Sequence, residues 1–236
     1  IAFKRLQAER GPLRHLHLPG VDAFALPGYQ DAHFQQVLFT DADALAAALP
    51  AVADFYRGHG LSRWRVTLTP GQRGAARVLG AAAYRPDFTV VAMGAWLHEL
   101  PDAAPGVPVE TVEDLDELVE INVHTYGAEW RDILSVWQRP PRLPVHTVVA
   151  REHGRALSCG LVVDVADTAG VYLVATHPEA RGLGLASAVM RGIIREARRR
   201  GCTAMVLQST QAGIRVYRHL GFRDLGPWEH WVPQEP

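Results

Sequence analysis

The stretch VYLVATHPEARGLGLASAVM, residues 171–190, decides how this chain folds. It begins with an apolar, β-branched run typical of a strand and ends in a pattern typical of an amphipathic helix. Between them lie Arg181, Gly182 and Gly184, with no acidic side chain from 180 to 187. A strand, a glycine turn and a helix present unpaired backbone N–H groups at the positive end of the helix dipole. The turn therefore predicts an anion site, above all for phosphate, with glycines that keep side chains out of the ligand's path.

Three kinds of phosphate loop can be compared with this turn. The Walker loop requires a Gly-Lys-Ser/Thr ending, and no lysine follows here. The dinucleotide fingerprint requires a third glycine and an acid about twenty residues later, and residues 203–209, TAMVLQS, contain none. The remaining form is a pyrophosphate loop, Q/R-x-x-G-x-G/A, which Arg181, Gly184 and Ala186 match.

Another motif, STQAGIRVYRHLGF at 209–222, follows at the spacing expected for one known family. Together the two motifs resemble the GCN5-related N-acetyltransferase (GNAT) superfamily over about residues 106–236. The motif at 209–222 is similar to that family's N-x-x-A-x-x-x-Y-x-x-x-GF segment, with Thr210 where asparagine is common. Threonine can still cap a helix that begins there, but a side-chain amide contact to the cofactor is lost.

The resemblance implies that acetyl-CoA is the co-substrate and lies between the strands at 171–176 and 203–208, which such proteins splay apart. A backbone N–H near Val174 or Ala175 would face the thioester carbonyl, and Tyr217 would protonate the leaving thiolate. No metal is implied. The implied cofactor-binding residues are Val174, Ala175, Thr176, Arg181, Gly182, Leu183, Gly184, Leu185, Ala186, Ser187 and Thr210.

The predicted fold class is α/β, or α+β, with a mixed central sheet flanked by helices and two GNAT-like halves. The proline-rich segment HELPDAAPGVP predicts a linker at 98–108 between a degenerate domain at 1–97 and a catalytic domain at 109–236. In the later half, strands are expected at 107–112, 145–152, 155–166, 170–176, 203–208 and 229–232. Helices are expected at 113–127, 129–138, 186–201 and 211–221.

The earlier half resembles the end of the later one. Gly60 aligns with Gly201 at an offset of 141, and Ala83-Tyr84-Arg85 aligns with Gly221-Phe222-Arg223 at an offset of 138. These offsets put Asp41 and Asp43 opposite the glycines of the loop, and Leu79 opposite Tyr217. Carboxylates repel phosphate and leucine has no proton to give, so we expect the first copy to keep a fold without the chemistry.

Bulk composition excludes several classes of protein. With a net charge of −1 and a pI near 6.9, nothing favours binding to nucleic acid or an anionic membrane. No apolar run reaches the roughly 20 residues of a membrane span. Cys159 and Cys202 form no metal-binding or redox motif, so a reduced, cytoplasmic protein is predicted.

The general base and the acceptor are not defined by the sequence. Glu110, Glu129 and Asp164 are candidate bases, none of them distinguishable from a surface charge, and no base is assigned. His177 is interpreted as a loop residue. The acceptor pocket is expected to be aromatic, with candidates Tyr126, Trp130, Trp228, His230 and Trp231.

The predicted function is N-acetylation of a primary amine, which could be a small molecule, an amino acid or a peptide N-terminus, by direct attack in a ternary complex. The alternative is a non-catalytic CoA-binding sensor or assembly module that kept the phosphate turn. A longer acyl donor and an oligomer both stay open. We also expect a fragment of residues 106–236 to bind CoA but to lose activity or solubility.

Overall fold

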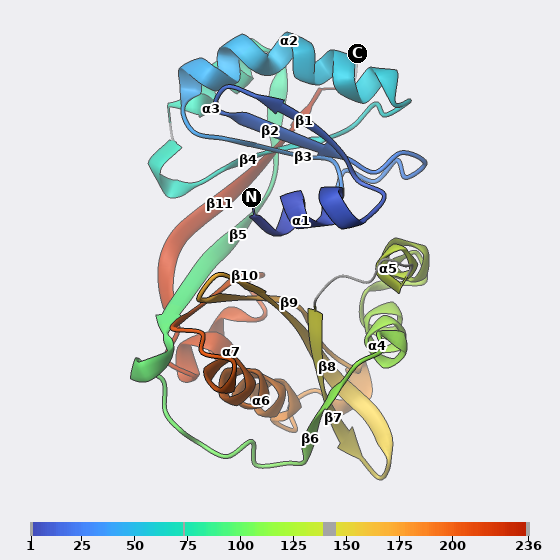
Figure 1. Ribbon diagram of the computed structural model, residues 1–236, viewed down its shortest axis with the longest axis vertical. Coiled ribbons are helices and arrows are strands. Elements are labelled where there is room, and N and C mark those ends of the chain that lie inside the picture. The colour runs from blue at the N-terminus through green and yellow to red at the C-terminus, as the bar shows by residue number, and fades with distance from the viewer. Residues whose placement is uncertain (1, 73, 139–144, 235–236) are drawn as a thin grey trace. The chain divides into compact units, whose positions relative to one another are not determined.

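A computed structural model describes residues 2–72, 74–138 and 145–234 of the chain (Figure 1). It divides into two compact units: Ile1–Val91 with Gly226–Pro236, and Ala92–Leu225. Among the described residues, no helix combines the length and hydropathy that a membrane span requires.

The first unit begins with a short helix and a meander. In chain order it contains α1 Ala2–Arg10, β1 Arg14–Leu18, β2 Val21–Ala25, β3 Gln36–Phe39, α2 Ala42–Gly58, β4 Arg65–Leu68, η1 Pro70–Gln72, α3 Ala75–Ala81 and the start of β5 Tyr84–Trp96. Strands β1, β2 and β3 pair antiparallel, and β3 and β4 pair parallel. The end of β11 Arg223–Pro233 then pairs antiparallel with β4, so the last strand of the chain completes this sheet.

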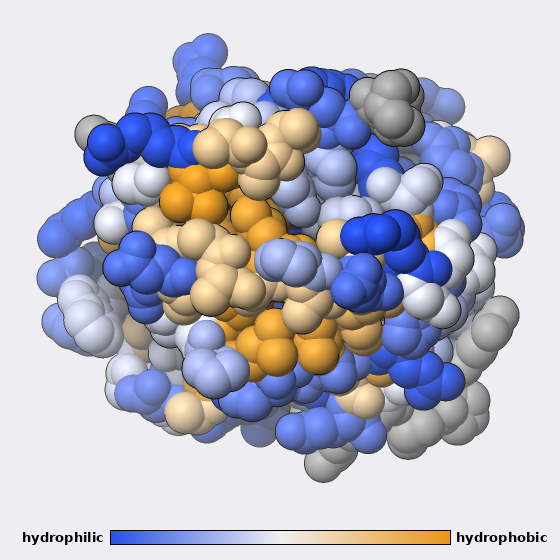
Figure 2. Space-filling view, turned by 90° about the horizontal axis from the view of Figure 1, so that it is seen from above, coloured by the Kyte–Doolittle hydropathy of each residue, from blue (hydrophilic) through white to orange (hydrophobic). Residues whose placement is uncertain are grey.

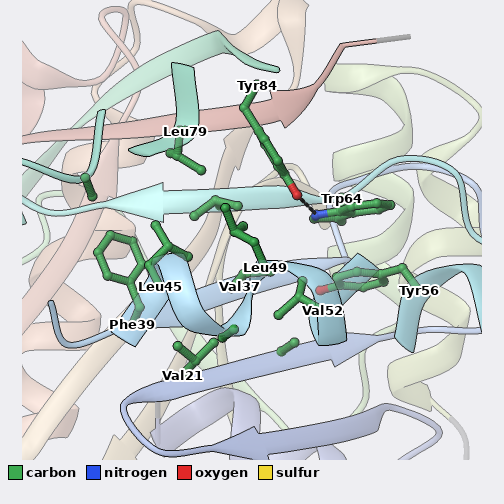
Figure 3. Close-up of a cluster of buried hydrophobic side chains, with 14 of the residues drawn as sticks. Val21, Val37, Phe39, Leu45, Leu49, Val52, Tyr56, Trp64, Leu79 and Tyr84 are labelled. Carbon is green, nitrogen blue, oxygen red and sulfur yellow. Dashed lines mark hydrogen bonds between the residues drawn. The ribbon is translucent and has the colours of Figure 1, made fainter. Parts of the chain in front are cut away.

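The core of the first unit lies between this sheet and α2. Leu45, Leu49, Val52 and Tyr56 recur every three or four residues, so one stripe of α2 faces the strands (Figure 3). The buried Tyr56 hydroxyl donates to the carbonyl oxygen of Phe24 at 3.0 Å. In the same cluster, the indole N–H of Trp64 donates to the Tyr84 hydroxyl at 3.0 Å, drawn dashed in Figure 3.

The outward side of α2 is also rich in small apolar residues. Ala46, Ala47 and Ala51 are exposed. Figure 2, which views the molecule from above, shows hydrophobic residues gathered among hydrophilic ones on the face that bears this helix. The alanines favour helix formation without contributing to the core.

The second unit contains the predicted mixed sheet. Its elements are the end of β5, η2 Leu97–Glu99, β6 Val109–Val112, α4 Asp116–Tyr126, α5 Trp130–Gln138, β7 Val145–Glu152, β8 Arg155–Val165, β9 Thr168–Thr176, η3 Pro178–Ala180, α6 Leu185–Arg199, β10 Ala204–Ser209, α7 Ile214–His219 and the start of β11. The strand order is β5-β10-β9-β8-β7-β6, with β9 and β10 parallel and β6 to β9 antiparallel.

Helices cover both faces of this sheet. Neighbouring residues of β8 point to opposite faces. Cys159 contacts Asn122 of α4, whereas a side chain at Gly160 would touch Ile193 and Val189 of α6. The near-continuous burial of β8 follows from this two-sided cover. The prediction of a mixed sheet flanked by helices is confirmed.

The compact units differ in their bounds from the predicted domains 1–97 and 109–236. The reason is that β5 and β11 each run from one unit into the other: Ala92–Trp96 of β5 belongs to the second unit, and Gly226–Pro233 of β11 to the first. The predicted linker 98–108 lies wholly inside the second unit, where its first two residues end η2. The last strand was expected at 229–232, but β11 spans Arg223–Pro233, because its first residues belong to the second unit and the rest to the first.

The helices α2 and α6 end in the same way. Gly60 and Gly201 both have a positive φ, of 71° and 86°. In each case the residue after the glycine donates its N–H to the carbonyl five residues earlier, at 3.0 Å: Leu61 to Tyr56, and Cys202 to Ala197. This is the Schellman arrangement, in which glycine is favoured at the left-handed position.

The helices α3 and α7 end alike as well. Ala82 donates its N–H to the carbonyls of Val78 and Leu79, and Leu220 donates to those of Val216 and Tyr217. The next residues, Ala83 and Gly221, both have a positive φ. Leu79 and Tyr217 therefore occupy matching places in two helices that each lead into a long strand.

Candidate functional site

The parallel strands β9 and β10 are paired over only part of their length. Thr168–Val171 of β9 pair with Ala204–Leu207 of β10, and the register ends there. Just beyond, Leu173 has a φ of +53°, and the register with β8 shifts between Cys159 and Leu161. An αL residue and an extra residue make a β-bulge, which bends the strand and ends its pairing. The two strands thus part before β9 ends, in the region where the resemblance implies a ligand between them.

Four successive carbonyls after the bulge accept hydrogen bonds from side chains. Three of the donors are hydroxyls, at 3.4, 2.9 and 3.3 Å, and one is a thiol at 3.7 Å. The pairs are Cys159 to Leu173, Tyr126 to Val174, Ser158 to Ala175, and Thr125 to Thr176. The donors come from α4 and β8, and we call these four pairs the β9 clamp. The clamp fixes a segment of β9 that no longer pairs with β10 but still pairs with β8.

The backbone N–H groups of Val174 and Ala175 differ in their surroundings. The N–H of Ala175 reaches the sulfur of Cys159, where it counteracts the effect of burial, which raises the pKa of that thiol to about 12. Ala175 is buried, whereas Val174 is half-buried. Of the two, Val174 is the better candidate to donate to a ligand.

The glycine turn lies at the end of η3 and the start of α6. Gly182 and Gly184 have φ values of 82° and 78°, and Gly184 is the N-cap of α6 without any side-chain cap. A side chain at either position would meet no atom within 4 Å. Glycine is needed there for the backbone conformation, and the space beside the turn is open.

The N–H groups of this turn have no partner within the part of the chain that the structure describes. The donors without a backbone or side-chain acceptor are those of Gly182, Leu183, Gly184, Leu185, Ala186 and Ser187. The first paired N–H of α6 is that of Ala188, which donates to the Gly184 carbonyl at 3.0 Å. Arg181 is exposed and makes no ion pair with any described residue. A cluster of free donors beside a free cation is suited to a phosphate group.

Tyr217 is a buried residue of α7. It is 9 % exposed, its ring lies 6.0 Å from that of Phe222, and its hydroxyl makes no hydrogen bond to another described residue. Burial, and then the nearby Tyr126, raise the pKa of Tyr217 above its ordinary value. The phenol therefore keeps its proton at neutral pH, as a proton donor must.

Thr210 does not cap a helix, contrary to the prediction. α7 begins at Ile214 with Gly213 as an N-cap that lacks a side-chain hydrogen bond. The backbone carbonyl of Thr210 accepts from Gly213 and from the Ser209 hydroxyl, at 3.0 and 2.8 Å. A turn at 211–213 delays the helix expected at 211–221, and only Ile214–His219 are helical.

Two of the three candidate bases are engaged in ion pairs. Glu110 pairs with Arg151, and Asp164 with Arg200 at 2.9 Å. The Arg200 guanidinium lowers the pKa of Asp164 despite partial burial, which makes it a weaker base. Glu129 has no ion pair with a described residue, and its carboxylate lies close to Gly127. His177 is a loop residue, as predicted. Its side chain is buried, and Nη2 of Arg155 lies 3.2 Å from its Nε2.

The aromatic residues predicted for the acceptor pocket belong to different units. Tyr126 and Trp130 lie in the second unit with ring centroids 5.3 Å apart. Trp228, His230 and Trp231 lie in the first, where His230 stacks on Phe88 and Trp231 packs against the core. Sequence reasoning placed the last three in the later domain because it could not see that β11 changes unit.

Comparisons with known proteins bear on this fold. Residues 112–222 match the family model described as "Acetyltransferase (GNAT) family". No curated protein matches the chain. Among solved structures, a GCN5-related N-acetyltransferase from Kribbella flavida is 17 % identical, with a TM-score of 0.77, covering 100 % of this chain and 95 % of that one.

Two further structures are similar. A GCN5-related N-acetyltransferase from Sphaerobacter thermophilus is 18 % identical with a TM-score of 0.60, covering 90 % of this chain and 80 % of the other. A tandem GNAT protein from the clavulanic acid biosynthesis pathway is 15 % identical with a TM-score of 0.64, covering 91 % and 79 %. At these identities the structures establish the fold alone.

The parted strands and the open glycine turn define an α/β fold of the acyltransferase type. Residues 112–222, just under half of the chain, match the model of the GNAT family, and the structural neighbours share this fold. That family supports acyltransferase activity in general, and its members generally use acetyl-CoA as co-substrate.

Proposed function

We propose that the chain is an acetyl-CoA-dependent N-acetyltransferase that transfers an acetyl group to a primary amine, with its site in the second unit. The observation that carries the proposal is the set of unpaired N–H groups at residues 182–187, beside strands that have already parted. The pyrophosphate of CoA would bind these groups and Arg181. The pantetheine arm would lie along the free edge of β9, at Thr176 and Val174.

The residues of the second unit have separate roles in this reaction. The Val174 N–H would donate to the thioester carbonyl oxygen as negative charge develops there. The amine nitrogen attacks the carbonyl carbon and loses a proton to water, the C–S bond breaks, and the sulfur takes a proton from Tyr217, which is then reprotonated by solvent. Holding both substrates in one complex supplies much of the acceleration.

Direct attack is favoured over a covalent cysteine intermediate. Both cysteines of the chain are buried, and burial raises the pKa of Cys159 to about 12 and that of Cys202 above its ordinary value. The nucleophilic thiolate is therefore scarce at neutral pH. No residue is assigned as general base, because an amine that arrives partly deprotonated needs none.

We further propose that the first unit is a degenerate copy of the second. The support is the similar hydrogen bonding at the paired helix ends, at Gly60 with Gly201 and at Leu79 with Tyr217. In the first unit the Asp41 carboxylate accepts from the Ala44 N–H at 2.9 Å, so the start of α2 has its own anion. A copy with a carboxylate at the helix start and leucine for tyrosine retains neither the phosphate site nor the proton donor.

Thiol release tests the function. Full-length protein with acetyl-CoA and a panel of amines, amino acids and peptides should release free CoA thiol only when a suitable amine is present. Calorimetry with CoA alone tests the cofactor site. Binding without turnover on any amine would favour the CoA-binding module, and absence of binding would refute both.

A further inference from the structure

Two histidines and an aspartate lie together on the hairpin β1–β2 of the first unit (Figure 1), remote in sequence from the residues of the proposed reaction. His15 and His17 are two residues apart on β1, so they share one face of the strand. Asp22 of β2 lies directly opposite His17. Their potential ligand atoms all lie within 4.8 Å of one another.

The carboxylate of Asp22 is buried at the centre of this group. The side chain of Asp22 is 7 % exposed; its Oδ1 lies 2.7 Å from Nε2 of His15 and 3.0 Å from Nδ1 of His17. Arg5 of α1 donates to both carboxylate oxygens, to Oδ2 at 2.8 Å and more weakly to Oδ1 at 3.3 Å. The guanidinium thereby fixes the orientation of the carboxylate, and Oδ1 faces the two imidazoles.

We propose that His15, His17 and Asp22 bind one Zn²⁺ ion. Zinc prefers imidazole nitrogen and carboxylate oxygen at about 2.0–2.2 Å, which puts neighbouring ligands of a tetrahedral site roughly 3.3 Å apart. The two separations from Oδ1 lie within about 0.6 Å of that spacing before any metal is bound. Water supplies the fourth ligand, and Arg5 stays on Oδ2 as a support for the ligating carboxylate.

The surroundings of the two imidazoles favour this assignment. His15 stacks on Phe24 with centroids 4.5 Å apart and planes at 9°, so its ring is already oriented. His17 is 64 % exposed, which gives an ion a path to the site. Because all three ligands lie on β1 and β2, the ion would stabilise this hairpin; the proposal does not depend on the acetyltransferase function.

Calorimetry on tag-free, chelator-treated full-length protein tests the site with ZnCl₂. The wild type should bind one equivalent, and His17→Ala should bind at least tenfold more weakly. His98→Ala, which removes an exposed histidine of η2 in the second unit, should bind like the wild type. Zinc should raise the melting temperature of the wild type and His98→Ala but not that of His17→Ala.

Two results would overturn the proposal: no stoichiometric zinc binding by the wild type, or equal binding by His17→Ala. Since His17 is exposed, this variant should keep the melting temperature of the wild type without zinc, which separates loss of a ligand from loss of fold. Co²⁺ provides a further readout. The wild type should show the intense visible bands of a four-coordinate ion, and a weak six-coordinate spectrum would contradict the geometry.

Discussion

The Ser158 hydroxyl donates to the carbonyl oxygen of Ala175 at 2.9 Å, inside the β9 clamp. Both residues are buried, and Ser158→Ala removes this hydrogen bond together with the contact of the hydroxyl to Oγ1 of Thr176 at 2.9 Å, which should cost about 1–3 kcal/mol of stability. Without this hydrogen bond, β9 should shift, and the Val174 N–H with it. The variant should therefore lose more in kcat than in affinity for CoA. Ser135→Ala is the matched control, because that hydroxyl donates to the Asp132 carbonyl on an exposed helix. Equal effects on kcat would argue against a positioning role for the clamp.

A negative charge in the glycine turn should abolish the phosphate site. Gly184→Asp introduces the residue type found in the first turn of α2, and aspartate tolerates a positive φ better than most residues. We expect at least a tenfold loss of CoA affinity, about 1.4 kcal/mol, measured by calorimetry. Gly201→Asp makes the same change at a φ of 86° in open space at the far end of α6. It should affect stability alone, and a similar loss of affinity there would contradict the site.

Loss of the Tyr217 hydroxyl should slow the reaction without weakening CoA binding. Tyr217→Phe should lower kcat by about 10²–10⁴-fold if the phenol is the proton donor. Tyr56→Phe provides a control, because it removes a buried hydroxyl from the first unit and should cost about 1–3 kcal/mol of stability without changing kcat. Unchanged turnover in Tyr217→Phe would show that Tyr217 is not the proton donor, but it would leave the proposed acetyltransferase activity standing.

The stability of the protein should fall as the pH falls from about 6.5 to about 4. Burial, assisted by Arg65, lowers the pKa of His230 from 6.5 to about 4, so the folded state favours the neutral ring. This contribution is complete above the ordinary pKa and is lost as the pH falls through the lowered one; it amounts to about 3 kcal/mol. Denaturant unfolding of His230→Gln should show a weaker pH dependence than the wild type or His98→Gln. Parallel pH curves for all three would contradict the shift.

A fragment of residues 106–236 should not fold as a stable CoA-binding domain. It lacks Ala92–Trp96, the part of β5 that lies in the second unit, and it leaves Gly226–Pro233 without β4. The sequence alone suggested that this fragment binds CoA. Circular dichroism and calorimetry on the fragment and on the full chain decide between the two expectations, and tight CoA binding by the fragment would refute the one drawn from the structure.

The sequence predicted features that depend on local chemistry. The glycine turn, the alternation of strands with helices and the glycine that ends α6 follow from residue types at fixed spacings. The correspondence of Leu79 with Tyr217 was predicted from a residue offset of 138, and the helices that carry these two residues end with similar hydrogen bonds.

Features that depend on long-range pairing were not accessible. Strand β11 reads as a short apolar run, and nothing local indicates that its second part pairs with β4 of the other unit. The β9 clamp was missed for the same reason. In the sequence Thr125 and Ser158 are ordinary polar residues, and only the fold brings them, from α4 and β8, to the carbonyls of β9. The start of α7 was misplaced because a turn and a first helical turn share the same residue preferences.

The pairing of β11 with a strand from the N-terminal half has a consequence for biosynthesis. Strand β4 pairs with residues 229–231, which the ribosome adds only after β4 and the whole of the second unit, so the N-terminal half emerges with a sheet that it cannot yet complete. Domains of most nascent chains fold in order as they leave the exit tunnel. Here the first half must wait for β11, and until that strand is available the free edge of β4 is open to pairing with other chains.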